Sequence, residues 1–213
     1  MINPNDFIIS RKRKKYKFAK YANSELCFEL EEWARQAVDV IEVGAGTGLF
    51  IVELASRHPD MSFVAVDVKA DRLQKGAYEA EARGLTNVRF LRARADQLTD
   101  CFVPGSVKSI WLTFADPFPK KGSAGRRMSH PTYLAIYHAL LAPFGTFLLK
   151  HDSPEFFNWS LEQLVITGWH IQELTFDLHQ SHLADDYKIM TSYETRWTEE
   201  GRATQLVAAR MVK

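Results

Sequence analysis

The chain has 213 residues, of which 46% are apolar and 25% charged, with a formal net charge of +1. These values are typical of one globular α/β domain. Cys27 and Cys101 are too few for a disulfide framework and match no metal-ligand spacing. No apolar run approaches the roughly 20 residues that a membrane span requires, so a cytoplasmic protein is expected.

The charge is unevenly distributed along the chain. Residues 1–24 hold seven of the 27 basic residues and one of the 26 acidic ones, so this segment carries +6 and the remainder −5. We interpret residues 1–24 as a basic N-terminal arm, with residues 25–213 forming a single domain. A basic arm on a mildly acidic body indicates a polyanionic partner, although a solvated tail would have the same composition.

From residue 26 onward, helical stretches alternate with apolar runs. Expected helices are 26–37, 49–57, 70–83, 131–141 and 154–167, and expected strands are 38–43, 62–66, 87–91, 109–114 and 145–150. This alternation predicts right-handed βαβ units and a parallel sheet with helices on both faces. Two further strands, 169–176 and 205–211, have no helix between them, which predicts an antiparallel C-terminal strand and seven strands in all.

A glycine-rich turn follows the first strand of the expected parallel sheet. Glu42-x-Gly44-x-Gly46-x-Gly48 opens a helix, and Asp67 lies 19 residues after Gly48, at the end of the next strand. Glycines allow a ligand to approach the backbone closely, and an acid at this spacing can accept the hydroxyls of a ribose. Nicotinamide fingerprints have their third glycine one residue later, so S-adenosylmethionine fits this spacing better.

The segment Asp116-Pro117-Phe118-Pro119-Lys120-Lys121 directly follows the buried strand 109–114. Its two prolines fix φ and stiffen the loop. The carboxyl end of a parallel strand is where open α/β folds bind their ligands, so Asp116 and Phe118 are expected at that crevice. The two lysines make the same crevice attractive to phosphate.

Taken together, these motifs resemble the tRNA (guanine-N7-)-methyltransferases of the bacterial single-chain type. The resemblance rests on Glu42–Gly48, on Asp116–Lys121 with Arg126 and Arg127, on Lys150-His151-Asp152, on Asp177-Leu178-His179, and on Thr191-Ser192-Tyr193-Glu194-Thr195-Arg196. It implies a Rossmann-like class I methyltransferase fold. Two departures stand out: Phe118 replaces the usual Trp, and Gly122-Ser123 replaces an Arg-His pair.

The resemblance also implies roles for individual residues. Glu42, Gly44, Gly46, Gly48, Asp67 and Asp116 would line the cofactor site, Asp116 would also lie at the reaction centre, and Lys120, Asp152, Thr191, Glu194 and Arg196 would contact the substrate. The adenine-side acid is assigned to Asp96, although simple alignment places Arg94 there. Asp152 alone could equally cap a helix, and Thr191 and Glu194 alone could be surface residues.

The implied reaction transfers a methyl group from S-adenosylmethionine to guanine N7 in tRNA, at position 46 of the variable loop. Guanine N7 carries a lone pair at neutral pH, so positioning matters more than a general base. Alternatives are an N-methyltransferase for another RNA or small molecule, and a non-catalytic RNA-binding module with a vestigial cofactor pocket. His179 and His182 are a weak metal signal, so no metal is expected. No protein partner is expected to be required, and a homodimer is left open.

Overall fold

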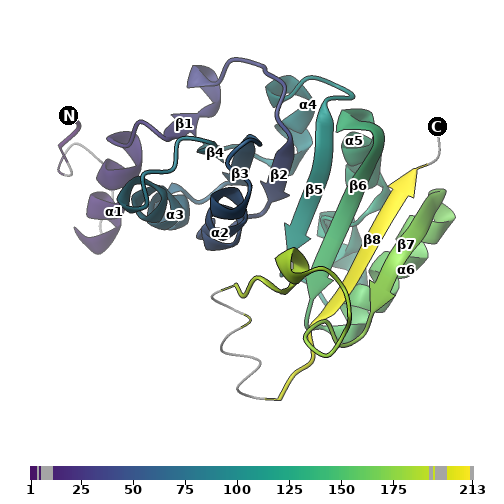
Figure 1. Ribbon diagram of the computed structural model, residues 1–213. Helices are drawn as coiled ribbons and strands as arrows, with labels where there is room; N and C mark the ends of the chain where they lie inside the picture. The colour runs from purple at the N-terminus through teal and green to yellow at the C-terminus, as the bar shows by residue number, and fades with distance from the viewer. Residues whose placement is uncertain (4, 6–11, 192–193, 195–200, 212–213) are drawn as a thin grey trace.

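The computed structural model describes residues 1–3, 5, 12–191, 194 and 201–211, and strands of one sheet run through its centre (Figure 1). The strands are β1 (Cys27–Glu29), β2 (Val40–Val43), β3 (Phe63–Asp67), β4 (Val88–Arg92), β5 (Val107–Thr113), β6 (Leu141–His151), β7 (Trp169–Thr175) and β8 (Gln205–Met211). Their order across the sheet is β1-β4-β3-β2-β5-β6-β8-β7. Among these described strands, β8 alone runs opposite to the rest.

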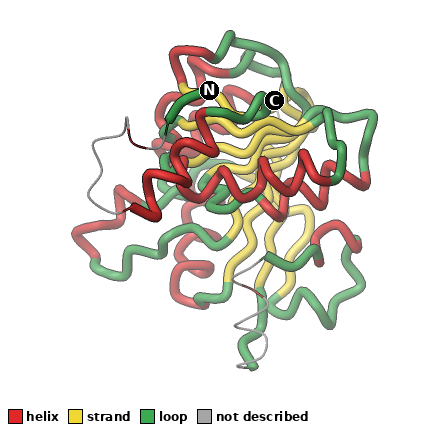
Figure 2. The backbone as a smooth tube through the Cα atoms, turned by 90° about the vertical axis from the view of Figure 1, so that its left-hand side faces the viewer, coloured by secondary structure: helices red, strands yellow, loops and turns green. Residues whose placement is uncertain are grey.

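Helices cover both faces of the sheet (Figure 2). They are α1 (Lys12–Ala22), α2 (Leu49–Arg57), α3 (Ala70–Ala82), α4 (Leu98–Cys101), α5 (Pro131–Leu140) and α6 (Pro154–Ile166). Alternate residues of each strand point to opposite faces. Ile110 and Leu112 therefore join the core beneath α4, α5 and α6, whereas Trp111 joins the core beneath α2 and α3.

On the second face, β5, β6 and β8 are covered by a loop segment where a helix would be expected. This segment, residues 178–191, includes the short 3₁₀ helix Asp185–Lys188. Leu178 and Ile189 are buried in the same core as Trp111 and Leu148. Through these two side chains, the described segment 178–191 contributes to the hydrophobic core.

The expected fold class is confirmed, but the element assignment missed the helices α1 and α4 and was wrong for residues 26–37. Residues 26–37 do not form the expected helix: Cys27–Glu29 pair in parallel with β4, and a 3₁₀ turn, Leu30–Glu32, follows. The sheet therefore has eight described strands rather than seven. A three-residue edge strand depends on pairing with a distant strand, and local sequence periodicity carries little information about it.

The second half of the basic arm is ordered as α1, which packs against α3. Tyr21 is buried, and its hydroxyl donates to the carbonyl oxygens of Phe28 at 2.7 Å and Phe90 at 3.1 Å. Residues 12–22 thus belong to the folded body, while residues 6–11 lie outside the described residues. The division of the chain into an arm and a domain stays a prediction.

Three observations concern membranes, metals and thiols. Within the described residues, no helix combines the length and apolar character that a bilayer span needs. The same part of the chain holds no group of three or more His, Cys, Asp or Glu side chains placed to bind a metal ion.

Cys27 and Cys101 are both free thiols, and burial raises the pKa of Cys27 to about 12 and that of Cys101 to about 11.

Candidate active site

Gly44 and Gly46, from the turn between β2 and α2, line a pocket at the carboxyl edge of the sheet, whereas Gly48 does not line it and its role in the cofactor site stays a prediction. Gly44, Gly46 and Gly48 all have positive φ, at 69°, 57° and 68°. This backbone region strains residues that carry a Cβ atom. At Gly48 a Cβ would also lie 2.8 Å from the ring of Phe90. Glycine at position 48 is therefore required both by backbone conformation and by packing.

Asp67 ties the glycine turn to the end of β3. Its Oδ2 accepts from the backbone N–H of Gly46 at 2.8 Å, and its Oδ1 accepts from the N–H of Lys69 at 2.8 Å. Each carboxylate oxygen has further acceptor capacity. Asp67 lines the pocket together with Arg72, so it can accept the two hydroxyls of a ribose placed there.

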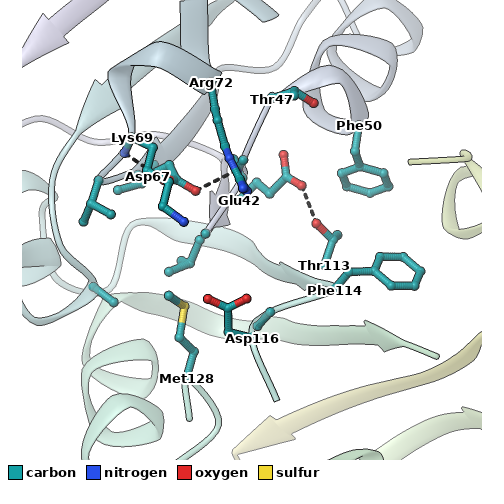
Figure 3. Close-up of a pocket in the computed structure, with 18 of the residues that line it drawn as sticks. Glu42, Thr47, Phe50, Asp67, Lys69, Arg72, Thr113, Phe114, Asp116 and Met128 are labelled. Carbon is teal, nitrogen blue, oxygen red and sulfur yellow. Dashed lines mark hydrogen bonds between the residues drawn. The ribbon is translucent and has the colours of Figure 1, made fainter. Parts of the chain in front are cut away.

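Glu42, the third residue of β2, forms the floor of the pocket. The hydroxyl of Thr113 donates to its Oε1 at 2.5 Å, whereas its buried Oε2 makes no hydrogen bond to the described residues (Figure 3). Burial raises the pKa of Glu42 to about 8, despite the lowering effects of the Thr113 hydroxyl and of the nearby Ile51 backbone N–H. A buried oxygen without a partner is costly, and a ligand carrying an ammonium group would satisfy it.

Asp116 lies at the mouth of the pocket, on a loop with unusual backbone geometry. Phe114 and Phe118, two residues before and after it, have positive φ of 47° and 40°. Non-glycine residues rarely adopt this conformation, and such strain concentrates at functional sites. The side chain of Asp116 is exposed and points into the pocket from the side opposite Glu42 and Asp67 (Figure 3).

The two arginines behind this loop have different roles in the structure. Arg127 donates to the carbonyl oxygens of Pro117 and Phe118, each at 3.1 Å, and its guanidinium lies 4.4 Å from the ring centroid of Trp159. Arg126 is exposed, with its guanidinium 4.3 Å from the ring centroid of Phe118. Arg127 therefore holds the loop, while Arg126 lies at the surface.

The remaining expected site residues are distributed around this pocket. Thr191 lines it, Lys120 is exposed at the beginning of the 3₁₀ helix Lys121–Arg126, and Arg196 lies outside the described residues. Asp152 is partly buried beside His151, and its Oδ2 lies 3.4 Å from Arg202. Neither Lys120 nor Asp152 lines the pocket, so their contacts with substrate stay predictions.

Two expected site residues are already engaged by protein groups. The exposed carboxylate of Asp96 accepts from Arg94 at 2.9 Å, and neither residue lines the pocket, which Ala93 and Ala95 do. Glu194 is completely buried and bonded to protein at both oxygens. The roles expected for Asp96 and Glu194 stay predictions.

Sequence reasoning missed much of the pocket lining, including three residues whose side chains bear on its chemistry. Arg72 comes from the first turn of α3, Thr113 from the end of β5, and Met128 from the segment after the arginine pair. Thr113 could have been found as the one polar residue at the end of an apolar run, on the strand beside Glu42. Arg72 and Met128 carry no comparable signal, because only the tertiary fold brings them to the pocket.

Solved structures with the same fold define the class of the protein. The chain superposes on a structure titled 16S rRNA methyltransferase KamB with a TM-score of 0.63, 19% identity, and coverage of 86% of this chain and 90% of that one. A SAM-dependent methyltransferase from Aquifex aeolicus gives a TM-score of 0.57, 15% identity, and coverage of 86% and 87%. The fold is that of class I S-adenosylmethionine-dependent methyltransferases.

Sequence relatives narrow the class to a family. Residues 36–206 match a family model described as "Putative methyltransferase". A tRNA (guanine-N(7)-)-methyltransferase of Brevibacillus brevis is 37% identical, over 81% of this chain and 80% of that protein. The protein of the same name from Geobacillus kaustophilus is 38% identical, over 76% and 73%. This chain belongs to the tRNA (guanine-N(7)-)-methyltransferase family, which confirms the resemblance seen in its motifs.

Proposed function

We propose that this protein transfers a methyl group from S-adenosylmethionine to N7 of a guanine in tRNA. The observation that carries the proposal is that two distant motifs meet at one pocket. Asp116, from the proline loop, and Thr191, from the segment before β8, both line the pocket that Glu42 and Asp67 form. The family membership of the chain supports tRNA as the substrate.

The residues of the pocket fit the cofactor. Glu42, with its buried oxygen lacking a partner among the described residues, would hold the ammonium of the methionine moiety, and Asp67 would hold the ribose. The positive-φ turn from Gly44 to Gly48 leaves room at its backbone for the ligand. When bound, S-adenosylmethionine supplies an electrophilic methyl group on a sulfonium.

Asp116 would act where base and cofactor meet. Guanine N7 needs no proton removed, so the task of the protein is alignment, and fixed alignment can lower a barrier substantially. A guanine methylated at N7 is positively charged, and a carboxylate in a fixed position stabilises that developing charge. The loop held by Arg127 fixes the Asp116 backbone before substrate arrives.

RNA recognition would use the groups around the mouth of the pocket. Lys120 and Arg126 are exposed and suit phosphate oxygens. Asp152 can accept from the two N–H groups of the guanine Watson–Crick edge, a pattern that adenine lacks. A guanine held by that edge must be unpaired, which favours a loop nucleotide, and we assign position 46 of the variable loop. We place the reaction in the cytoplasm and require no protein partner for it.

A labelling experiment tests this function. The protein is incubated with methyl-labelled S-adenosylmethionine and an unmodified tRNA transcript, and the labelled nucleotide is mapped by cleavage at N7-methylguanine. We expect label at the variable-loop guanine, and none in a matched transcript with adenine at that position. Label on another base, or on a small molecule but never on tRNA, would overturn the proposal.

A further inference from the structure

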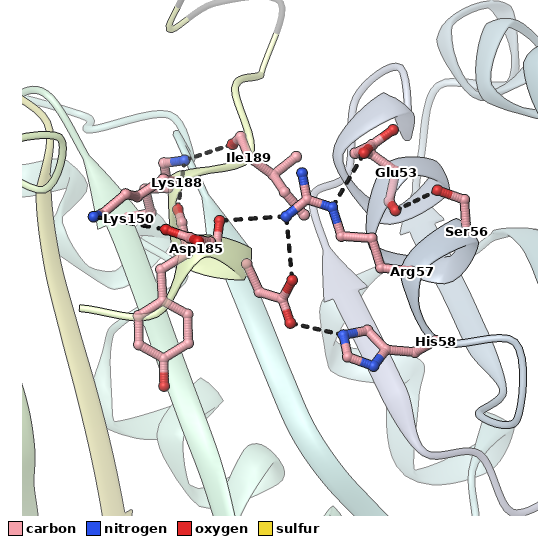
Figure 4. A network of polar contacts seen from close by, with 10 residues as sticks. Glu53, Ser56, Arg57, His58, Lys150, Asp185, Lys188 and Ile189 are labelled. Carbon is pink, nitrogen blue, oxygen red and sulfur yellow. Dashed lines mark hydrogen bonds and ion pairs between the residues drawn. The ribbon is translucent and has the colours of Figure 1, made fainter. Parts of the chain in front are cut away.

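The segment that carries Thr191 and Glu194 is anchored at two places. At the first, Asp186 contacts α2, with its Oδ1 3.3 Å from Arg57 and its Oδ2 2.7 Å from Nε2 of His58. Figure 4 shows Arg57 and His58 facing the part of the segment that holds Asp185 and Lys188. These groups are about one-third exposed, and ion pairs of that kind contribute little stability. The second anchor is buried, so it is the stronger candidate for setting the position of the segment.

The buried anchor is a clamp on the carboxylate of Glu194. Its Oε2 lies 2.7 Å from Lys150 Nζ and accepts from the backbone N–H of Thr191 at 3.1 Å, and its Oε1 lies 2.7 Å from His179 Nε2. The side chains of Glu194 and Lys150 have no exposed surface. Because this carboxylate has no exposed surface, a guanine could reach it only if these bonds broke and the segment moved.

Thr191 and Glu194 also bond to each other reciprocally. The hydroxyl of Thr191 accepts from the backbone N–H of Glu194 at 3.1 Å, while the Glu194 side chain accepts from the backbone N–H of Thr191. This pair of bonds is a capping box, the pattern that Thr-x-x-Glu forms at a helix start. Through it, the position of Glu194 determines the position of Thr191 at the pocket.

Lys150 connects the clamp to the cofactor side of the site. Its ammonium donates to the carbonyl oxygens of Ile189 at 2.7 Å and Tyr187 at 2.9 Å, in addition to its contact with Glu194. An ammonium group has three donors, so each has an acceptor. On the sheet, Lys150 pairs with Thr113, which bonds to Glu42 in the cofactor pocket.

We propose that Lys150 and His179 are positioning residues for substrate recognition, which hold Glu194 so that Thr191 faces the pocket. Glu194 then acts through this clamp rather than by reading the guanine itself. The inference rests on the proposed function, because the segment being positioned is the one that would contact tRNA. It assigns a function to a buried charge cluster that the methyl transfer itself does not use.

A double-mutant cycle separates a clamp from direct base reading. Lys150→Met and Glu194→Met each leave one buried charge unpaired, whereas the double variant removes both. We expect each single variant to raise KM for tRNA at least tenfold, with kcat at saturating tRNA changed less than threefold. The double variant should have a KM at least threefold below that of Glu194→Met. A double variant no better than Glu194→Met would mean that Glu194 contacts the base directly, and would overturn the proposal.

A second pair of variants, at positions that are not fully buried, keeps the proposal testable if Lys150→Met or Glu194→Met does not fold. His179 is 26% exposed, so His179→Asn should fold, and His182→Asn is its matched control on an exposed neighbour. We expect His179→Asn to raise KM for tRNA several-fold and His182→Asn to leave it unchanged. Equal KM values for the two variants would contradict the clamp.

Hydrogen exchange tests the clamp without using activity. In the tRNA-free protein, His179→Asn should accelerate amide exchange over residues 178–191, while exchange in β2 and β3 stays at the wild-type rate. If wild-type protein fails to methylate tRNA but this exchange result holds, the proposed function fails and the clamp stands as a structural device. If wild-type protein methylates tRNA, but His179→Asn changes neither the amide exchange of residues 178–191 nor the KM for tRNA, then the clamp is rejected and the proposed function stands.

Discussion

Thr113 and Glu42 lie on neighbouring parallel strands, and the hydroxyl of Thr113 donates to Oε1 of Glu42 across 2.5 Å. Both side chains are buried. One oxygen of the carboxylate is thus satisfied by the fold, and the other is available to a ligand. This asymmetry leads to the first prediction.

The prediction for Glu42 concerns pH. Burial raises the pKa of Glu42 from 4.5 to about 8, so the folded protein retains a proton that the unfolded chain releases above pH 4.5. The stability contributed by this group is therefore present at low pH and is lost as pH rises from 4.5 through 8. Glu42→Gln should be stabilised relative to wild type at pH 9 by at least about 1.4 kcal/mol, the value of one pKa unit, and much less at pH 5.

Thermal unfolding of the cofactor-free proteins at the two pH values measures this difference, because subtracting the wild-type curve removes other titrating groups. Glu42→Gln should also bind S-adenosylmethionine at least tenfold more weakly by calorimetry, because the ammonium of the bound cofactor favours the ionised form of Glu42 and Gln cannot supply that charge. Parallel stability curves for the two proteins across this pH range would contradict the burial argument.

Asp116→Asn tests the reaction centre. The exposed side chain contributes little to folding, so the melting temperature should change by less than about 2 °C. Loss of the carboxylate should lower kcat/KM for tRNA at least tenfold, or about 1.4 kcal/mol in the barrier. Single-turnover methylation at saturating cofactor is the measurement. Asp100→Asn, an exposed position on α4 outside the pocket lining, is a matched control that should retain wild-type turnover.

Arg127→Met tests whether the loop around Asp116 must be held in its strained form. The variant loses the bonds to the carbonyls of Pro117 and Phe118, so the loop should relax and kcat should fall about tenfold or more. The adjacent variant Arg126→Met removes an exposed guanidinium of the same size. It should weaken tRNA binding while leaving kcat near wild type. Equal kcat values would show that Arg127 does not maintain the active loop.

The basic arm is better tested by substitution than by deletion, because α1 is part of the fold and deletion would remove the buried Tyr21. Lys14→Gln combined with Lys17→Gln should weaken tRNA binding. The salt slope of log Kd should become shallower by about 0.7 to 0.9 for each phosphate that the variant no longer neutralises. Lys108→Gln, at the opposite end of β5 from the pocket, is the control. A slope identical to wild type would make α1 a packing element only.

Much of the site could be predicted from the sequence because its parts are local. Three parts of the site each follow an apolar run that becomes a buried strand: the glycine turn 44–48, Asp67 and Asp116. The carboxyl ends of parallel strands meet at one edge of the sheet. Their convergence follows from topology alone. The positive φ of Phe114 and Phe118 could not be predicted in this way, because phenylalanine does not signal a left-handed backbone conformation.

Long-range features were beyond sequence reasoning. The burial of Lys150 depends on Glu194 and on the carbonyls of Tyr187 and Ile189, about 40 residues away along the chain. A lysine at a strand end is more often exposed. The Thr191-x-x-Glu194 spacing did contain a capping-box signal, but its link to a buried lysine could be found only in the folded chain.

The burial of Leu178 and Ile189 has a consequence for how this enzyme can be altered. In many enzymes a recognition loop can be exchanged between relatives as a module, because it only touches the scaffold. Here the segment is also the cover of the sheet beside Trp111 and Leu148. A graft of residues 178–191 from a relative would have to bring its matching strand residues with it, so changes in RNA specificity and changes in the core must be made together.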